Sequence, residues 1–202
     1  MYGALGNATT TTSLTATTVV GTSGTGSLGN VSDASSGSRH TCTVVGGSVY
    51  CWGWNVSGQL GTNSTISSAT PVQVVGVGAS GWLTGVTKVA SGYAHTCALK
   101  SGEVYCWGNN SYGQLGIDST SNSKTPVRVL NVAGGGSLSG VTAIAAGAYH
   151  TCAVAGGQVY CWGLNSSGQL GDSTTSNALY PTGVLNSGYV GLTGASSLSA
   201  GA

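Results

Sequence analysis

The chain is built from a unit that recurs every 55 residues. Three sequence motifs mark the unit, and each occurs at the same spacing. His-Thr-Cys begins at residues 40, 95 and 150, Val-Tyr-Cys-Trp-Gly at 49, 104 and 159, and Gly-Gln-Leu-Gly at 58, 113 and 168. A repeat of this length is typical of proteins that pack equal supersecondary units side by side. One unit therefore predicts most of the fold.

Each unit contains a β-hairpin whose register follows from its turn. A two-residue turn at Gly46 and Gly47 pairs Val44 with Val49 and places the two cysteines of the hairpin directly opposite each other. Counting outward from the turn, the cysteines fall on a non-hydrogen-bonded pair, where side chains of opposite strands are closest. The other two copies have the turns Ser101-Gly102 and Gly156-Gly157.

The register predicts three disulfides, each within one hairpin: Cys42 with Cys51, Cys97 with Cys106, and Cys152 with Cys161. Free thiols and a metal site with His95 as a third ligand are the alternatives. Zinc sites usually place paired ligands two to four residues apart, whereas His95 lies two residues before Cys97 on an extended strand, so disulfides are favoured. Disulfides indicate an oxidising compartment, so we expect a secreted, extracellular or cell-surface protein.

Short β-branched runs predict the other strands of each unit. Residues 86–90 and 141–145 precede a hairpin. Residues 71–75 and 126–130 follow one, and both of these later runs begin with Pro. No helical periodicity is present. Four antiparallel strands per repeat, joined by loops of Gly, Ser, Thr and Asn, predict an all-β fold of β-propeller blades.

The repeat resembles that of the regulator of chromosome condensation family, most clearly over residues 86–116. The resemblance implies a propeller, commonly of seven blades, whose ring is closed by strands from both chain ends. The cysteines and the Ser-, Thr- and Asn-rich background look most like the secreted bacterial branch. Two features depart from the family: seven such repeats need about 385 residues, and residues 31–37 are degenerate.

We expect residues 1–202 to form a single repeat domain with three complete blades and a fourth split between the ends. The blades are predicted at 31–75, 86–130 and 141–185; residues 1–30 supply an outer strand (13–20) and linker, and residues 189–202 an inner strand (192–200). Unpaired strands of this kind are templates for further pairing. The expected partners are therefore the rest of a longer propeller chain or other copies of this one. A small closed ring that lacks one hairpin is a less favoured alternative.

Only 4% of the residues are charged, and the formal net charge is +1. The few basic residues cannot build the patch that phosphate neutralisation requires, so nucleic acid is not an expected partner. No apolar run approaches the length of a membrane span.

No candidate catalytic, metal or cofactor site emerges. His40, His95 and His150 occupy one equivalent position, which is more typical of a structural hydrogen bond than of catalysis. The acids are scattered, with Glu103 expected to pair with Lys100 across a turn, and no serine elbow or phosphate loop is present. We therefore expect no enzyme and no cofactor.

Three further groups of residues have predicted roles. Repeated aromatics are expected to form the core between blades (Trp52, Trp107, Trp162, Tyr50, Tyr105 and Tyr160), whereas unrepeated ones could line a binding surface (Trp54, Trp82, Tyr112, Tyr180 and Tyr189). Gln59, Gln114 and Gln169 are expected to anchor loops between blades. Asn-x-Ser/Thr sequons, which are weak evidence of glycosylation in such a composition, occur at Asn7, Asn30, Asn55, Asn63, Asn109 and Asn165.

Two functions are consistent with these features. The first is a non-catalytic extracellular structural protein, a subunit or segment of a fibre or surface layer, because a near-zero net charge promotes association. The second is a secreted propeller module that binds a protein or a glycan.

Overall fold

The computed structural model describes residues 2–132 and 134–201, and it confirms the all-β class. Twelve strands form three separate four-stranded antiparallel sheets. The first sheet contains β1 (Val31–Ser36), β2 (His40–Val45), β3 (Ser48–Gly53) and β4 (Ser68–Gln73); the second β5 (Val86–Ser91), β6 (His95–Lys100), β7 (Glu103–Gly108) and β8 (Ser123–Arg128); and the third β9 (Val141–Ala146), β10 (His150–Ala155), β11 (Gln158–Gly163) and β12 (Ala178–Gly183). A single 3₁₀ turn, η1 (Val77–Ala79), is the only helical element in the described part of the chain.

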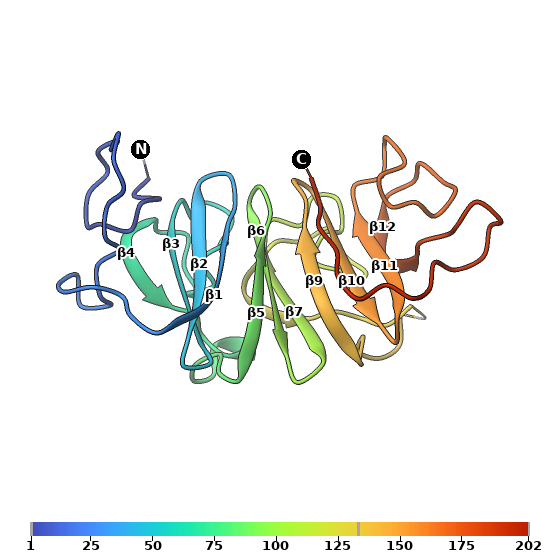
Figure 1. Cartoon of the computed structure of the whole chain (residues 1–202), viewed down its shortest axis with the longest axis horizontal. Helices are drawn as coiled ribbons and strands as arrows, with labels where there is room; N and C mark the ends of the chain where they lie inside the picture. Colours follow the sequence, from blue (N-terminus) through green and yellow to red (C-terminus); the bar gives the residue numbers. More distant parts are fainter. Residues whose placement is uncertain (1, 133, 202) are drawn as a thin grey trace.

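Each sheet is a meander in which sequence neighbours pair, and the three sheets stand side by side in chain order as blades (Figure 1). The first strands of neighbouring blades contact each other, so β1, β5 and β9 form the inner side of the arrangement. Between β1 and β5, the Ser91 amide donates to Ser35 Oγ at 2.9 Å, and the Val89 amide donates to Asp33 Oδ2 at 2.7 Å. Among the described residues, no helix has the length and apolar character that a bilayer crossing requires.

The predicted hairpin register is confirmed in all three blades. Cys42 lies opposite Cys51, and Val44 lies opposite Val49, with the same pairing in the other two hairpins. The outer strands differ from the prediction, because β4 begins at Ser68 and Pro71 lies inside it. The ladder between β3 and β4 is irregular next to Gly53, and β4 is the outer edge of its sheet, so a residue without an N–H is tolerated there.

Apolar side chains fill the space between neighbouring blades. Trp107 of the second blade is fully buried in a cluster with Val44, Leu60 and Val74 of the first blade, and Trp162 takes the same place between the second and third blades. Trp107 and Trp162 are therefore inter-blade core, as predicted, whereas the buried Trp52 donates to the Ala4 carbonyl of the N-terminal segment. Burying one indole removes roughly 200 Å² of surface from water, which stabilises the packing of two neighbouring blades by about 5 kcal/mol. Among the repeated tyrosines only Tyr105 is buried, and its equivalents in the other blades are half-buried.

The segments outside the three blades keep the hydrogen bonds of the repeat but form no strand. The Val20 amide donates to the Gly6 carbonyl as Val75 does to Gly61, and the Ala195 amide donates to Gly157 as Val86 does to Gly47. Neither 13–20 nor 192–200 is a strand, contrary to the sequence prediction, because the hairpin that would pair with them is absent from the described chain. The C-terminal segment nevertheless runs beside the third blade (Figure 1).

Glycine is required where the inner strands turn into the hairpin. A Cβ on Gly92 would lie against the His95 ring and 2.5 Å from the Gly147 carbonyl oxygen, and Gly37 and Gly147 are equally crowded. The chain of each blade thus passes so close to the next that no side chain fits. This spacing sets how tightly the blades can approach at the centre.

We predict that Gly92→Ala destabilises the protein by at least 2 kcal/mol, since both neighbours of the new methyl group are held in place by hydrogen bonds. Urea unfolding followed by circular dichroism measures the change. Gly135→Ala is the matched control, because a Cβ at Gly135 meets no atom within 4 Å. Equal midpoints for the two variants would contradict the assigned close approach.

Candidate functional site

All six cysteines are joined as the three pairs expected from the register. The Cα atoms of each pair are 4.1 Å apart, the short spacing of a non-hydrogen-bonded pair. Cys42, Cys51, Cys97 and Cys106 have no exposed surface. Because the thiolates are used in disulfides, the alternative metal site with His95 is not formed. The cysteines are part of the blade scaffold.

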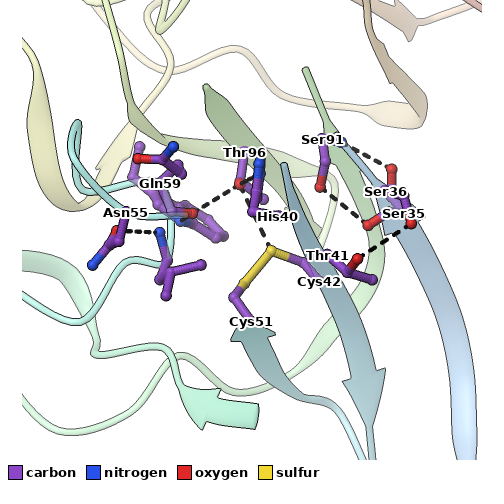
Figure 2. The surroundings of a disulfide bond; sticks show 12 residues. Ser35, Ser36, His40, Thr41, Cys42, Cys51, Asn55, Gln59, Ser91 and Thr96 are labelled. Carbon is purple, nitrogen blue, oxygen red and sulfur yellow. Dashed lines mark hydrogen bonds between the residues drawn. A yellow bond between two sulfur atoms is a disulfide. The ribbon is translucent and has the colours of Figure 1, made fainter. Parts of the chain in front are cut away.

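The repeated histidines join one blade to the next (Figure 2). His40 Nε2 lies 2.9 Å from Thr96 Oγ1 of the next blade, and the Thr96 hydroxyl donates to the Gln59 carbonyl at 2.9 Å. The Trp107 indole donates to the same carbonyl at 2.9 Å. Because the threonine hydrogen is used on the carbonyl, the histidine must carry its proton on Nε2 and donate. We call this set of bonds the inter-blade junction.

The same junction recurs at the next boundary with equal geometry. His95 Nε2 lies 3.0 Å from Thr151 Oγ1, and Thr151 and Trp162 both donate to the Gln114 carbonyl at 2.9 Å. Gln59 and Gln114 therefore link blades, but through their main-chain carbonyls, whereas the bond found for Gln169 among the described residues lies within its own loop. The side-chain oxygen of Gln114 instead accepts the Tyr112 amide of its own loop.

Burial keeps the junction histidines neutral. Desolvation lowers the pKa of His40 to about 4 and that of His95 to about 3, with the neighbouring histidines adding to the second shift. The pKa of His150 is also lowered by burial. Each ring of His40 and His95 is thus a neutral, buried donor that is held through Nε2, while its Nδ1 has no hydrogen-bond partner among the described residues.

The six sequons divide into two groups. Asn55 and Asn165 are fully buried, and the Asn55 amide donates to the Ser64 and Ile66 carbonyls while its oxygen accepts the Leu60 amide. These two side chains shape the loop after the hairpin and have no room for a sugar, so they are withdrawn as glycosylation candidates. The sequence did not single out their role, although Asn110 shares it at the same repeat position. Asn7, Asn30, Asn63 and Asn109 are exposed or half-buried and stay candidates.

Five aromatic rings form a continuous row across all three blades. The centroid distances between successive rings are 5.8 Å from Tyr2 to Trp54, 6.3 Å from Trp54 to Tyr93, 5.3 Å from Tyr93 to Tyr149, and 5.3 Å from Tyr149 to Tyr112. We call these five residues the aromatic ribbon. Its two end rings, Tyr2 and Tyr112, are 42% and 36% exposed, so the row is open to solvent.

Main-chain bonds between loops hold the ribbon in place. The Trp54 amide donates to the carbonyl of Arg39, the residue before the junction histidine, at 2.8 Å. The Tyr93 amide donates to the Ala148 carbonyl at 3.0 Å, which fixes the loop of the second blade against that of the third and brings Tyr93 beside Tyr149. The ribbon is therefore built on the same loops that make the inter-blade junctions.

One cation accompanies the ribbon. The Arg39 guanidinium lies over both Tyr2 and Trp54, 5.6 and 5.7 Å from their centroids. Of the ion pairs found within residues 2–132 and 134–201, neither involves Arg39. Arg39 also borders a cavity of about 470 Å³ lined by Tyr2 and by residues 3–5 and 9–13, and it is the only charged residue among the described ones that line it.

The remaining candidates lie elsewhere. Of the unrepeated aromatics, Trp54 and Tyr112 belong to the ribbon, whereas Trp82, Tyr180 and Tyr189 are not in contact with it. Glu103 does not form the expected ion pair with Lys100; its carboxylate accepts from Tyr105 and Ser137 and lies 3.5 Å from Arg128. The hydrogen bond from Tyr105 is the main cause of the lowered pKa of Glu103.

Three ribbon members were missed in the sequence because they do not stand at one repeat position. Tyr93 lies two residues before its junction histidine and Tyr149 one residue before, so a comparison by position treats each as unrepeated. Tyr2 lies near the chain start, outside any complete repeat. The detectable signal is the loop before each histidine, which carries Arg39, Tyr93 or Tyr149.

Four-stranded antiparallel blades that repeat along the chain and pack face to face define a β-propeller. The chain belongs to the regulator of chromosome condensation (RCC1) repeat family: the model of that repeat matches residues 46–99, 101–154 and 156–201. A second model of the same repeat matches residues 86–114 and 141–169.

Relatives include human HERC4, named as a probable E3 ubiquitin-protein ligase, which is 35% identical over 159 residues. Human HERC2, named as an E3 ubiquitin-protein ligase, is 36% identical over 144 residues. These matches cover 77% and 70% of this chain but only 14% and 3% of the relatives. The chain thus corresponds to a small part of each.

Among solved structures, yeast RCC1 (Prp20) bound to Kap60 superimposes with a TM-score of 0.67 at 22% identity, over 79% of this chain and 38% of that one. Human WBSCR16 superimposes with a TM-score of 0.52 at 20% identity, over 85% and 56% of the two chains. Both likenesses support the propeller fold.

We predict that the double variant Cys97→Ala/Cys106→Ala loses about 3 kcal/mol of chain-entropy stabilisation, together with the packing of two fully buried sulfurs. Urea unfolding measures the total. Cys152→Ala/Cys161→Ala is the matched variant, and it should lose less because its sulfurs lie in a smaller, partly exposed cluster. An unchanged midpoint for the first variant would contradict a stabilising disulfide.

We predict that acid weakens the fold through the junction histidines. A histidine whose pKa is lower when folded than the unfolded value of 6.5 gives its full stabilisation above about pH 6.5, and this declines as the pH falls toward about 4 for His40 and about 3 for His95. At about pH 5 each histidine should have lost roughly 2 kcal/mol. Urea midpoints at about pH 7.5 and 5 measure the slope.

The variant His40→Gln/His95→Gln tests the assignment, because glutamine can still donate to threonine but does not titrate. Its stability should be lower at neutral pH, and its loss of stability between the two pH values should shrink to the part that His150 and other groups contribute. A variant that keeps the wild-type slope would place the acid sensitivity in other groups.

Proposed function

We propose that this chain is a non-catalytic binding module whose ligand lies on the aromatic ribbon. The observation that carries the proposal is the ribbon itself: four rings from the three blades and Tyr2 from the N-terminal segment form one open row, and Arg39 at one end has no ion pair with the described residues. Aromatic residues and arginine are the side chains most enriched at binding hot spots. A row of this kind on a rigid scaffold needs little reorganisation to bind.

A non-catalytic binding role is consistent with where the repeated histidines lie. His40 and His95, the repeated groups with acid–base chemistry, are held inside the junctions away from the ribbon. The ligase names belong to relatives of which this chain spans a small fraction. Yeast Prp20, which shares the fold, was solved in a complex with the protein Kap60. By analogy we propose a protein partner for this chain.

We further propose an extracellular location. Three disulfides and no free cysteine among the described residues support it, since disulfides persist in oxidising compartments. Glycosylation at Asn7, Asn30, Asn63 or Asn109 belongs to the same proposal. Attached sugar would hydrate a surface that has few charges.

Structural assembly, as in a fibre or surface layer, is the second candidate function. It is favoured by His150, which lies where His40 and His95 lie but has no threonine partner among the described residues. A further blade, from the same chain or from another copy, would supply that hydroxyl. The low net charge permits such close association.

We predict that the double variant Trp54→Ala/Tyr93→Ala reduces ligand binding at least tenfold, because it removes two of the three inner rings of the row. Wild type and variant are compared on a peptide-display library and on a glycan array, and each hit is followed by calorimetry. The matched control Trp82→Ala/Tyr189→Ala removes two exposed aromatics outside the ribbon, 57% and 76% exposed. Binding that survives in the first variant and is lost in the control would overturn the proposed site.

A further inference from the structure

The rings of the ribbon do not form a flat platform. Successive ring planes are inclined to each other by 45°, 86°, 34° and 70°, which leaves angular notches between neighbouring rings. A sugar ring stacks best on a broad exposed face, which this arrangement does not offer. Side chains that project at intervals from an extended peptide fit such notches better. The ring geometry therefore favours a peptide over a glycan.

The spacing of the rings matches one peptide conformation. Successive centroids are 5.3 to 6.3 Å apart, and a polyproline II helix advances about 6 Å every two residues. The four steps together reach at most about 23 Å, the length of roughly seven such residues. Proline-rich segments dock in aromatic-lined grooves because this helix is already ordered before binding.

The hydrogen-bonding groups on the ribbon are complementary to that backbone. A polyproline II helix has no internal hydrogen bonds, so its carbonyl groups are available as acceptors. The hydroxyls of Tyr93, Tyr112 and Tyr149 make no hydrogen bond to the described residues. Each can donate to a peptide carbonyl without breaking an existing bond.

Arg39 adds a charge preference at one end. Its guanidinium lies over the Tyr2 and Trp54 rings and has no ion pair with the described residues, so its N–H groups are available to a carboxylate. The adjoining cavity of about 470 Å³ is lined by Leu5, Ala4 and threonines, and it accepts an apolar side chain next to that carboxylate. Arg39 therefore selects an acidic side chain at one end of the ligand, and the cavity selects an apolar side chain next to it.

We propose that the aromatic ribbon binds an extended, proline-rich protein segment that carries an acidic residue at the Arg39 end. This inference rests on the proposed binding function and names its ligand class. The acidic residue pairs with Arg39, a neighbouring apolar side chain enters the cavity, and the prolines lie across Trp54, Tyr93 and Tyr149.

The test is calorimetric titration of the full chain with synthetic probes. The first peptide has Pro-Pro-Ala units with Glu at one end, prepared with Glu at either end. The second has Lys in place of Glu, and the third keeps Glu but replaces the Pro-Pro-Ala units with Gly-Ser units. Oligogalacturonate is the acidic carbohydrate probe.

We expect the acidic proline peptide to bind at least tenfold more tightly than both other peptides. Arg39→Gln should remove the difference between the Glu and Lys peptides, and Trp54→Ala/Tyr93→Ala should remove binding. Lys100→Gln is the charge control, because Lys100 lies at the far end of β6 from the ribbon loops, and it should change nothing.

Three results would overturn this ligand class. Equal affinity for the proline and Gly-Ser peptides excludes the helical conformation, and no preference for Glu over Lys excludes the role of Arg39. Ribbon-dependent binding of oligogalacturonate without peptide binding assigns a glycan, in which case the proposed binding function stands and the peptide does not. If no probe binds, this inference fails, while the library and array comparison decides the binding function separately.

Discussion

The structure depends on a main-chain carbonyl that accepts two hydrogen bonds from the neighbouring blade. The Gln59 carbonyl accepts hydrogen bonds from the Thr96 hydroxyl and the Trp107 indole, and the Thr96 oxygen in turn accepts a hydrogen bond from His40. Each of these groups is buried, so losing one leaves the others without a partner in a dry interior. The blades are thus held in one relative position by a polar chain surrounded by apolar packing. Because hydrogen bonds and apolar contacts hold the blades together, the fold does not need many charged residues for its stability.

The junction also determines where a ligand can bind. Its loops cannot move without breaking buried bonds, and those same loops carry Arg39, Tyr93 and Tyr149 at their exposed ends. Rigid loops give a ribbon of fixed spacing, so its selectivity comes from shape and from one cation. The residues that hold the scaffold repeat with the 55-residue period, whereas the residues that face solvent vary between units. The repeated residues therefore stabilise the fold, and the unrepeated residues form the proposed binding surface.

Much of the fold followed from the sequence, because the hairpins are local. The turn at Gly46 and Gly47 sets the register, and the register brings Cys42 opposite Cys51 without any long-range information. The outer strands are predicted less accurately from sequence: Pro71 indicates a strand start, whereas the irregular pairing beside Gly53 lets the strand begin three residues earlier. The ribbon could not be assembled from sequence. Tyr93 and Trp54 are neighbours only because two blades pack side by side, and position within a repeat carries no signal for that contact.

The placement of the disulfides has a mechanical consequence. Each bond closes a loop within one hairpin, between residues nine apart, and none crosses from one blade to another. Under tension applied to its ends, the chain can therefore separate at a junction, where hydrogen bonds and apolar contacts alone resist, while the short loop inside each hairpin stays covalently locked. Extension would proceed in discrete steps, one blade at a time, and each released blade would keep its closed hairpin as a template for redocking when the force is removed.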